Sequence, residues 1–189
     1  MSEVPSQHHL VFETELGFIA IAWSQTGLTH LALPEGSYEA AEHRAARWSA
    51  GAAGKAEEAP AFVGEAVALI RRYATGEAID FSALPLDLTG IDPFRRAIYA
   101  AALKLAQGEV TTYGELADSA GFPKMARETG AALGRNPLPL VVPCHRILAA
   151  GGKIGGFSAP GGTVTKERLL SHEGVQLGPP PPAQASFAF

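Results

Sequence analysis

Hydrophobic and polar residues alternate in three short runs near the start of the chain. The runs cover residues 10–14, 18–23 and 28–33, and glycine-containing turns separate them. An alternating run between such turns is typical of a β-strand with one buried face. The pattern therefore predicts a three-stranded β-meander.

Two helices are predicted after the meander, in residues 38–49 and 61–74. Between them, residues 51–60 are rich in Gly, Ala and Glu, and we expect a flexible loop there. A short strand at residues 80–84 is expected to close this half of the chain. We find no internal repeat.

The second half of the chain carries clear helix signals. Asp92-Pro93 is typical of a helix start, and Gly108 is expected to end this first helix. The apolar residues of the segment share one face at helical spacing: Phe94, Ala97, Ile98, Ala101, Ala102 and Leu105.

A pair of short helices is predicted next. Thr112 and Glu115 form a capping-box pattern, which opens a helix that continues to Ala120. A further helix is expected over residues 124–133, ended by Gly134. Two short helices joined by a glycine-containing turn are typical of a helix-turn-helix, although a helical hairpin without a role in DNA binding has the same pattern.

The helix at residues 124–133 combines small residues with one arginine, Arg127. The small residues are Ala126, Gly130, Ala131 and Ala132. Small side chains let a helix backbone approach a surface closely, and Arg127 could then reach into that surface. The same small residues could equally pack against another helix.

The remaining segments are short. Residues 140–142 are apolar and predict a strand, whereas the glycine-rich residues 148–162 predict a loop or hairpin. A helix is expected at residues 163–172, with Gly174 as its C-terminal stop. Residues 177–189 contain four consecutive prolines and are expected to form a disordered tail.

The composition is that of an ordinary soluble globular protein. The chain has 189 residues, of which 47% are hydrophobic and 18% charged. It has no apolar run of about 18 residues, so we expect no membrane span. No signal-peptide pattern is present in residues 1–9, and the chain has a single cysteine. These features predict an intracellular, cytoplasmic protein.

The charge distribution is uneven. The formal net charge is -4, which by itself argues against a nucleic-acid partner. Residues 1–90 carry five Lys/Arg against twelve Asp/Glu, whereas residues 91–176 carry ten against seven. This mild basic excess indicates a partner that contacts only the second half.

Cys144, the only cysteine, lies in the segment VVPCHR at residues 141–146. It could be a buried structural residue, since free Cys packs as a small hydrophobe. It could also be a nucleophile, because the adjacent His145 could help a thiol to ionise directly or through water. Consecutive side chains diverge in extended backbone, so their direct contact does not follow. Glu173 is a candidate for orienting the imidazole.

Four segments, in this order, carry a resemblance to a known family. They are Gly108-Glu109-Val110-Thr111-Thr112-Tyr113, Gly134-Arg135-Asn136-Pro137, Pro143-Cys144-His145-Arg146, and Lys166-Glu167-Arg168-Leu169-Leu170 with His172-Glu173-Gly174. Together they resemble the O6-alkylguanine-DNA alkyltransferases, which repair alkylated bases. The resemblance covers residues 92–175, and the first half is similar to the family only loosely.

The resemblance implies an α+β fold. A ribonuclease H-like α/β domain at residues 1–90 would precede a helical domain at residues 91–176 with a winged helix-turn-helix-like motif. It also implies double-stranded DNA carrying O6-alkylguanine as the partner, approached from the minor groove by a monomer. No cofactor is implied, and O4-alkylthymine stays open as a second substrate.

The resemblance also implies an irreversible, single-turnover reaction. The damaged guanine would be flipped into a pocket, and Cys144 would take the alkyl group. His145 and Glu173 would remove the thiol proton through a water-linked relay. Tyr113 would donate a proton toward the leaving base, and Asn136 would brace the active-site turn.

Three residues are implied as DNA contacts in addition to Tyr113. Arg127 would fill the gap left by the flipped base, Ser158 would contact O6, and Phe157 would form a wall of the pocket. Phe157 and an Ala159-Pro160 insert depart from some members, which leaves the range of alkyl groups open.

Two basic residues stay ambiguous, and we expect no metal site. Arg135 and Arg146 fit ion-pair partners as well as DNA contacts. Some members of the family carry a structural zinc bound partly by cysteines, and this chain has no cysteine in its first half. The histidines of that half are insufficient without carboxylates: His8, His9, His30 and His43.

Three other functions fit parts of the pattern. A non-catalytic protein that binds alkylguanine lesions is the main alternative, and the presence of Cys144 argues against it because such proteins lack the cysteine. A helix-turn-helix regulator would carry an additional cysteine-rich metal domain. A cysteine hydrolase would need an oxyanion-hole signature, and none accompanies the thiol.

Overall fold

The computed structural model describes residues 8–49 and 59–177. The N-terminal half contains an antiparallel sheet with strand order β1-β2-β3, where β1 is His8–Thr14, β2 is Gly17–Trp23 and β3 is Leu28–Glu35. The predicted meander is therefore confirmed. The predictions for the loop at residues 51–60 and for the tail fall almost entirely outside the described residues.

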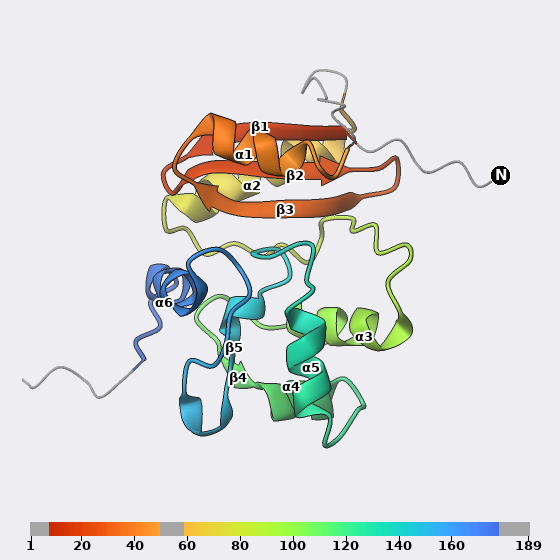
Figure 1. Cartoon of the computed structure of the whole chain (residues 1–189), viewed down its shortest axis with the longest axis vertical. Coiled ribbons are helices and arrows are strands. Elements are labelled where there is room, and N and C mark those ends of the chain that lie inside the picture. Colours follow the sequence, from red (N-terminus) through yellow and green to blue (C-terminus); the bar gives the residue numbers. More distant parts are fainter. Residues whose placement is uncertain (1–7, 50–58, 178–189) are drawn as a thin grey trace, which may run out of the picture.

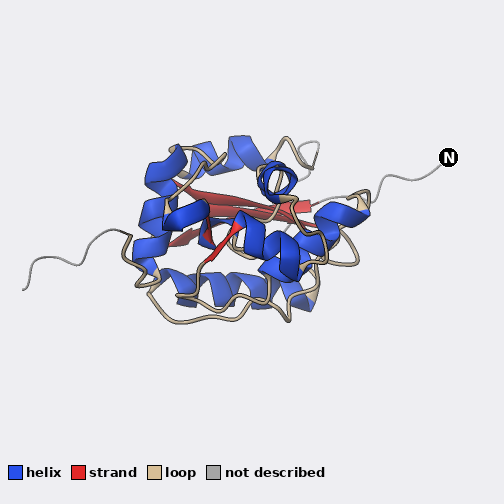
Figure 2. Ribbon diagram, turned by 90° about the horizontal axis from the view of Figure 1, so that it is seen from below, coloured by secondary structure: helices blue, strands red, loops and turns tan. Residues whose placement is uncertain are grey.

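One helix covers each face of this sheet, as Figures 1 and 2 show: α1 (Tyr38–Ala45) and α2 (Ala61–Ala74). The hydroxyl of Ser37 accepts a hydrogen bond from the backbone N–H of Ala40 and caps the start of α1. Helix α1 ends at Ala45, four residues before the end that we predicted. Helix α2 has the predicted bounds.

The alternation in β2 separates two hydrophobic clusters. Ile19, Ile21 and Trp23 join the main core, whereas Ala20 belongs to a smaller cluster with residues of α1. Side chains of a strand point to opposite faces in turn, so the large and small residues sort by face. Small residues on both sides let α1 lie close to the sheet.

The strand predicted at residues 80–84 is wrong. The Asp80 carboxylate accepts a hydrogen bond from the backbone N–H of Ser82 at 2.8 Å, so the chain turns where we expected it to extend. The pairing occurs further along, where Leu86 forms a single parallel bridge with Leu28.

The C-terminal half begins with α3 (Pro93–Ala102). The Asp92 side chain accepts a hydrogen bond from the N–H of Arg95, as expected for a helix start with Pro at its first position. The helix ends at Ala102 rather than at Gly108. A turn at Leu103, whose N–H still bonds to Tyr99, closes it before the glycine is reached.

The two helices of the predicted helix-turn-helix are present: α4 (Tyr113–Ser119) and α5 (Ala126–Leu133). Both hydrogen bonds of the capping box between Thr112 and Glu115 form. The connection carries Lys124 at a φ of +67°, so α5 starts two residues later than predicted.

A short parallel pairing that the sequence did not predict joins β4 (Thr111–Thr112) to β5 (Ile147–Leu148). The glycine-rich segment after β5 forms a loop that contains the single 3-10 turn η3 (Ala150–Gly152), which agrees with the prediction. Helix α6 (Gly162–His172) follows, and Gly174, at a φ of +79°, ends it as expected.

Residues 140–142 form a turn, so the strand predicted there is wrong. The N–H of Val142 donates to the carbonyl of Leu138 at 2.8 Å, and Leu140 has a φ of +76°. A left-handed residue cannot continue an extended strand. The turn leads into the 3-10 helix η2 (Cys144–Arg146).

The two halves pack against each other, with the sheet above the helical part in Figure 1. The N–H of Leu31 in β3 donates to the carbonyl of Pro137 at 2.9 Å, and His172 Nε2 donates to the carbonyl of Tyr73 at 2.7 Å. Within residues 8–49 and 59–177, no helix combines the length and apolar character that a bilayer crossing requires.

Candidate active site

Cys144 begins η2 and is 7% exposed. Its thiol lies in the wall of a cavity of about 530 Å³. The cavity also brings together the four residues predicted to contact DNA: Tyr113, Arg127, Phe157 and Ser158. They come from α4, α5 and the glycine-rich loop, so the cavity exists only because these three segments meet at η2.

A buried ionic cluster lies beside the thiol in the chain. His145 Nε2 is 2.7 Å from Glu173 Oε1. Arg146 Nε donates to Glu173 Oε2 at 2.8 Å, and its Nη2 donates to Oε1 at 2.9 Å. The side chains of His145 and Glu173 are fully buried. Glu173 follows the last turn of α6, and donors from His145 and Arg146 take the place of solvent around its carboxylate.

The hydrogen bonds of this cluster determine its protonation. Burial alone would raise the pKa of Glu173, but the hydrogen bonds from His145 and Arg146 and the positive charge of Arg146 outweigh it and lower the pKa to about 2. Burial lowers the pKa of His145, against the hydrogen bond and charge of Glu173. A neutral imidazole facing an ionised carboxylate carries its proton on Nε2.

The other ring nitrogen of His145 is therefore a base. Among the described residues, Nδ1 is buried and has no hydrogen-bond partner. A neutral imidazole with one bonded N–H and one free lone pair can accept a proton from a nearby group.

The thiol itself is held in its protonated form. Burial raises the pKa of Cys144, and this outweighs the hydrogen bond of Asn136 and the charge of Lys166, which lower it. Within the described residues, no hydrogen bond joins the thiol to the imidazole of His145, although the backbone N–H of His145 lowers the pKa of the thiol. Ionisation of Cys144 therefore requires a route to a base.

Asn136 braces the turn that presents the thiol. Its Nδ2 donates to the carbonyl of Val142 at 2.8 Å, and its Oδ1 accepts from the N–H of Leu138 at 3.0 Å. These two bonds span the left-handed residue Leu140 and fix the approach of the chain to Cys144.

Tyr113 stands against the glycine-rich loop. Its hydroxyl donates to the carbonyl of Gly156 at 3.3 Å. Gly155 has a φ of +69°, and a Cβ there would lie 3.3 Å from the Tyr113 ring. A larger residue at this position would push the loop away from Tyr113 and open the cavity. Ser158 Oγ donates to the carbonyl of Gly134 at 3.0 Å, which ties the same loop to the end of α5.

Comparison with known proteins agrees with this geometry. Residues 8–88 match the profile described as 6-O-methylguanine DNA methyltransferase, ribonuclease-like domain. Residues 93–175 match the profile described as 6-O-methylguanine DNA methyltransferase, DNA binding domain. The chain belongs to the 6-O-methylguanine DNA methyltransferase family.

Several methyltransferases are similar over nearly the whole chain. The methylated-DNA--protein-cysteine methyltransferase of Cricetulus griseus is 32% identical over 185 residues, which is 95% of this chain and 88% of the relative. The protein of the same name from Mycobacterium bovis is 34% identical over 163 residues, which is 86% and 89% of the two chains. The crystal structure of Mycobacterium tuberculosis OGT in complex with DNA has a TM-score of 0.69 at 31% identity and covers 88% of this chain and 92% of that one.

Three polar residues near the methyltransferase cavity were ambiguous or absent in the sequence prediction. Arg146 is buried in an ion pair with Glu173, which decides between its two expected roles. Lys166 is fully buried, and its Nζ lies 5.6 Å from the centre of the Tyr113 ring. Its spacing from the inward residues Leu169 and Leu170 could have revealed it, since the three share one helix face.

The third, Tyr73, lies on α2 in the other half of the chain, and its hydroxyl donates to Glu173 Oε1 at 3.0 Å. No sequence pattern connects residues that are 100 positions apart. Arg135, the other ambiguous residue, is exposed and donates to the carbonyl of Ala131.

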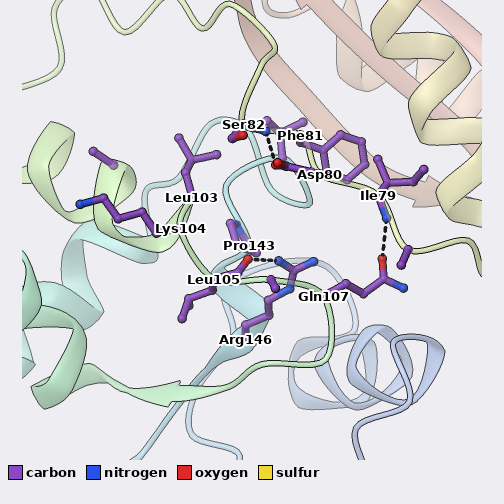
Figure 3. Close-up of a pocket in the computed structure, with 14 residues that line it drawn as sticks. Ile79, Asp80, Phe81, Ser82, Leu103, Lys104, Leu105, Gln107, Pro143 and Arg146 are labelled. Atoms are coloured by element: carbon purple, nitrogen blue, oxygen red, sulfur yellow. Dashed lines mark hydrogen bonds between the residues drawn. The ribbon is translucent and has the colours of Figure 1, made fainter.

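A larger cavity of about 720 Å³ lies at the junction of the two halves, and Arg146 is the member of the ionic cluster that lines it (Figure 3). Residues 78–82, residues 103–107 and Pro143 line it. Arg146 Nη1 donates there to the carbonyl of Leu105 at 2.6 Å, so each of the three guanidinium nitrogens donates a hydrogen bond within the protein. The lining does not include Cys144, and we assign the chemistry to the smaller cavity.

The residues that the structure describes contain no group of three or more His, Cys, Asp or Glu side chains placed to hold a metal ion. His9 is bonded to Glu42 and Ser49, at 2.7 and 2.6 Å, and His30 stacks on Trp48.

Proposed function

We propose that this protein repairs DNA by transferring the alkyl group of O6-alkylguanine irreversibly to Cys144. The observation that supports this most directly is the position of the only cysteine, in the wall of a cavity and next in sequence to a buried histidine–carboxylate pair. The curated relatives are named methylated-DNA--protein-cysteine methyltransferases, which fits the same reaction.

The reaction is a single displacement. The Cys144 sulfur forms a bond to the alkyl carbon, the bond between that carbon and guanine O6 breaks, and the electron pair passes to the base. The product is a thioether, which does not hydrolyse, so each molecule acts once. An alkylated base inside a duplex is out of reach, so the nucleotide is turned out of the helix into the cavity.

We assign each polar residue a role in this displacement. His145 Nδ1 takes the thiol proton through a bridging water, and Glu173 holds the imidazole in the required tautomer. Tyr113 donates a proton toward the leaving base as negative charge develops on it. Asn136 keeps the turn in place and donates a hydrogen bond to the developing thiolate.

The raised pKa of Cys144 explains why proton transfer from the thiol to His145 is needed. A buried thiol that stays protonated is protected from oxidants and from other electrophiles, since only the thiolate reacts well. Proton transfer to His145 is then needed when the alkyl carbon is in place. The arrangement makes the thiol selective for a substrate that fills the cavity.

For DNA binding, we propose that α5 approaches the minor groove as part of the helix-turn-helix. Arg127 is exposed at the mouth of the cavity and would occupy the space of the flipped nucleotide. Phe157 would pack against the base, and Ser158 would bond to O6. We further propose that the chain acts as a cytoplasmic monomer, with its functional division near residue 90.

The intact mass of the protein tests the reaction. After incubation with a duplex that contains O6-methylguanine, we expect the mass to rise by one methyl group in place of a proton, in a one-to-one ratio. Cys144→Ala should gain nothing, and neither should the wild-type chain with an unmodified duplex. A duplex with O4-methylthymine, in the same assay, tests the second substrate.

The same experiment separates catalysis from the non-catalytic alternative. A protein that only binds lesions would retain the O6-methylguanine duplex without any gain of mass. That result would contradict the transfer reaction.

Arg127→Ala is expected to weaken base flipping more than overall DNA binding. Without the side chain nothing fills the gap in the base stack, whereas the phosphate contacts of the surface persist. A fluorescent base analogue at the lesion reports flipping, and titration of the duplex reports affinity. Arg135→Ala, another exposed arginine, serves as the control and should leave flipping intact. Equal losses of flipping and affinity in Arg127→Ala would contradict this role.

A further inference from the structure

The N-terminal half of the chain contributes one polar group to the ionic cluster of the C-terminal half. Tyr73, on α2, is fully buried, and its hydroxyl donates to Glu173 Oε1 at 3.0 Å. A second contact holds the same residue, because His172 Nε2 donates to the backbone carbonyl of Tyr73 at 2.7 Å. The rings of Tyr73 and His172 lie 5.0 Å apart. Both bonds cross between the halves, so the hydroxyl is held in a defined place.

Three donors share a single carboxylate oxygen. Glu173 Oε1 accepts from His145 Nε2, from Arg146 Nη2 and from the hydroxyl of Tyr73, whereas Oε2 accepts chiefly from Arg146 Nε. Each donor draws negative charge from the oxygen that it contacts. The hydroxyl of Tyr73 therefore competes directly with the imidazole for Oε1.

This competition bears on the proton affinity of His145. A carboxylate oxygen with its full charge would stabilise an imidazolium, since an opposite charge within hydrogen-bond distance favours the charged form. An oxygen that also accepts from a hydroxyl stabilises the imidazolium less. The neutral imidazole, whose Nδ1 can accept a proton, is then favoured near neutral pH.

We propose that Tyr73 is a positioning residue for alkyl transfer, which acts from the N-terminal half by holding Glu173 and by keeping His145 neutral. The inference rests on the proposed function of Cys144, His145 and Glu173. It gives the N-terminal half a part in the chemistry, in addition to its packing.

The surrounding groups are consistent with this role. Burial, followed by the charge and hydrogen bond of Glu173, raises the pKa of Tyr73, so the hydroxyl stays protonated and acts only as a donor. The other titratable or charged groups facing the cluster are Arg146 and Cys144 from η2, Lys166 and His172 from α6, and Asp80 from the segment before α3, whose pKa the charge of Arg146 helps to lower. Arg146 already donates to Oε1, Lys166 donates to the carbonyl of Ile147 and His172 donates to that of Tyr73, so none of them takes the place of the hydroxyl.

The test is Tyr73→Phe, which removes the hydroxyl and keeps the ring. Tyr99→Phe is the control, because Tyr99 is equally buried and its hydroxyl, which donates to the carbonyl of Ala132 at 3.0 Å and accepts from Arg95, makes no hydrogen bond to Glu173. The rate of methyl transfer in a single turnover is measured from pH about 5 to 8, where histidine titrates. In the plot of transfer rate against pH, the rate falls on the acid side as His145 becomes protonated. We expect this fall to occur about one pH unit higher in Tyr73→Phe than in wild type.

At pH values below the midpoints of both proteins, the transfer rate of Tyr73→Phe should be about tenfold lower than that of wild type. Tyr99→Phe should keep the wild-type profile, and both variants should bind the duplex as wild type does. Coincident profiles for Tyr73→Phe and wild type, or equal shifts in the two variants, would overturn the proposal.

The NMR titration of the His145 imidazole gives a readout that does not depend on transfer. We expect its midpoint to lie at higher pH in Tyr73→Phe than in wild type and Tyr99→Phe. An unchanged midpoint would refute the inference even if transfer occurs. A wild-type chain that transfers no methyl, with the midpoint shifted as expected, would refute the proposed function and leave only the effect of Tyr73 on the protonation of His145.

Discussion

Glu173→Gln is expected to lower the free energy of unfolding by about 3 kcal/mol and the rate of transfer by at least about 100-fold. The carboxylate is the only acceptor for Arg146 Nε and Nη2 and for His145 Nε2 among the described residues. The amide keeps the size of the side chain but removes its charge. It also turns an NH2 group toward donors.

Two consequences follow from this substitution. The buried guanidinium of Arg146 loses its counter-charge. Removal of one partner of a buried ion pair is strongly destabilising, because the other charge stays buried without compensation. The donors of His145 and Arg146 then share one neutral carbonyl oxygen in place of two charged ones, so the proton of His145 is held less firmly on Nε2 and Nδ1 becomes a poorer base. Urea unfolding measures the first effect, and single-turnover transfer measures the second.

Glu77→Gln is the control for Glu173→Gln. Glu77 pairs with Arg72 on the exposed surface, where water and salt weaken the attraction, and we expect no comparable change in stability or rate. Equal effects of the two substitutions would contradict the special position of Glu173.

Acid pH should reduce the difference in stability between wild type and Glu173→Gln. The pKa of Glu173 is lowered from 4.5 to about 2 in the folded protein. Above the higher value the carboxylate is ionised in both folded and unfolded chains, and its stabilisation is complete. Between pH 4.5 and about 2 the unfolded chain takes up a proton that the folded chain does not, so the stabilisation is lost as the pH falls. Unfolding measured across this window checks the sign.

Asn136→Ala is expected to lower the free energy of unfolding by about 2 kcal/mol and the transfer rate on the order of tenfold. The substitution removes two hydrogen bonds, to Val142 and from Leu138, each worth about 1 kcal/mol. Those bonds hold the turn around Leu140, whose left-handed backbone is unfavourable for a residue with a side chain. Without them the turn can relax and carry Cys144 away from the cavity.

The thiol offers a direct readout of this change. Cys144 is the only cysteine, so the reaction of the chain with iodoacetamide reports on this one site. Asn136 opposes the effect of burial on the pKa of Cys144, and its loss should move the pH dependence of the reaction upward. Ser119→Ala removes a single bond to the carbonyl of Leu116 in α4 and is the control. A thiol profile that is the same in Asn136→Ala and wild type would contradict the prediction.

Local signals in the sequence predicted most of the elements. The meander, the capping box at Thr112, and the stop at Gly174 depend on neighbouring residues, and all three are confirmed. The two strands that were predicted wrongly, at residues 80–84 and 140–142, were inferred from apolar residues. In both segments hydrogen bonds hold the chain in a turn. Asp80 forms a turn with Ser82, and the apolar residues 140–142 turn because Asn136 and Leu138 bond across them.

The sequence by itself determined the family and predicted the residues that line the cavity, because the cysteine and its motif are contiguous and distinctive. Only the tertiary structure decided which charged and polar groups surround Cys144, His145 and Glu173, and therefore how their pKa values are shifted. Arg146, Lys166 and Tyr73 act through burial and through distances between segments far apart in the chain, and neither quantity can be read from local spacing. Burial raises the pKa of Cys144, and this burial follows from the tertiary structure and not from the cysteine motif alone.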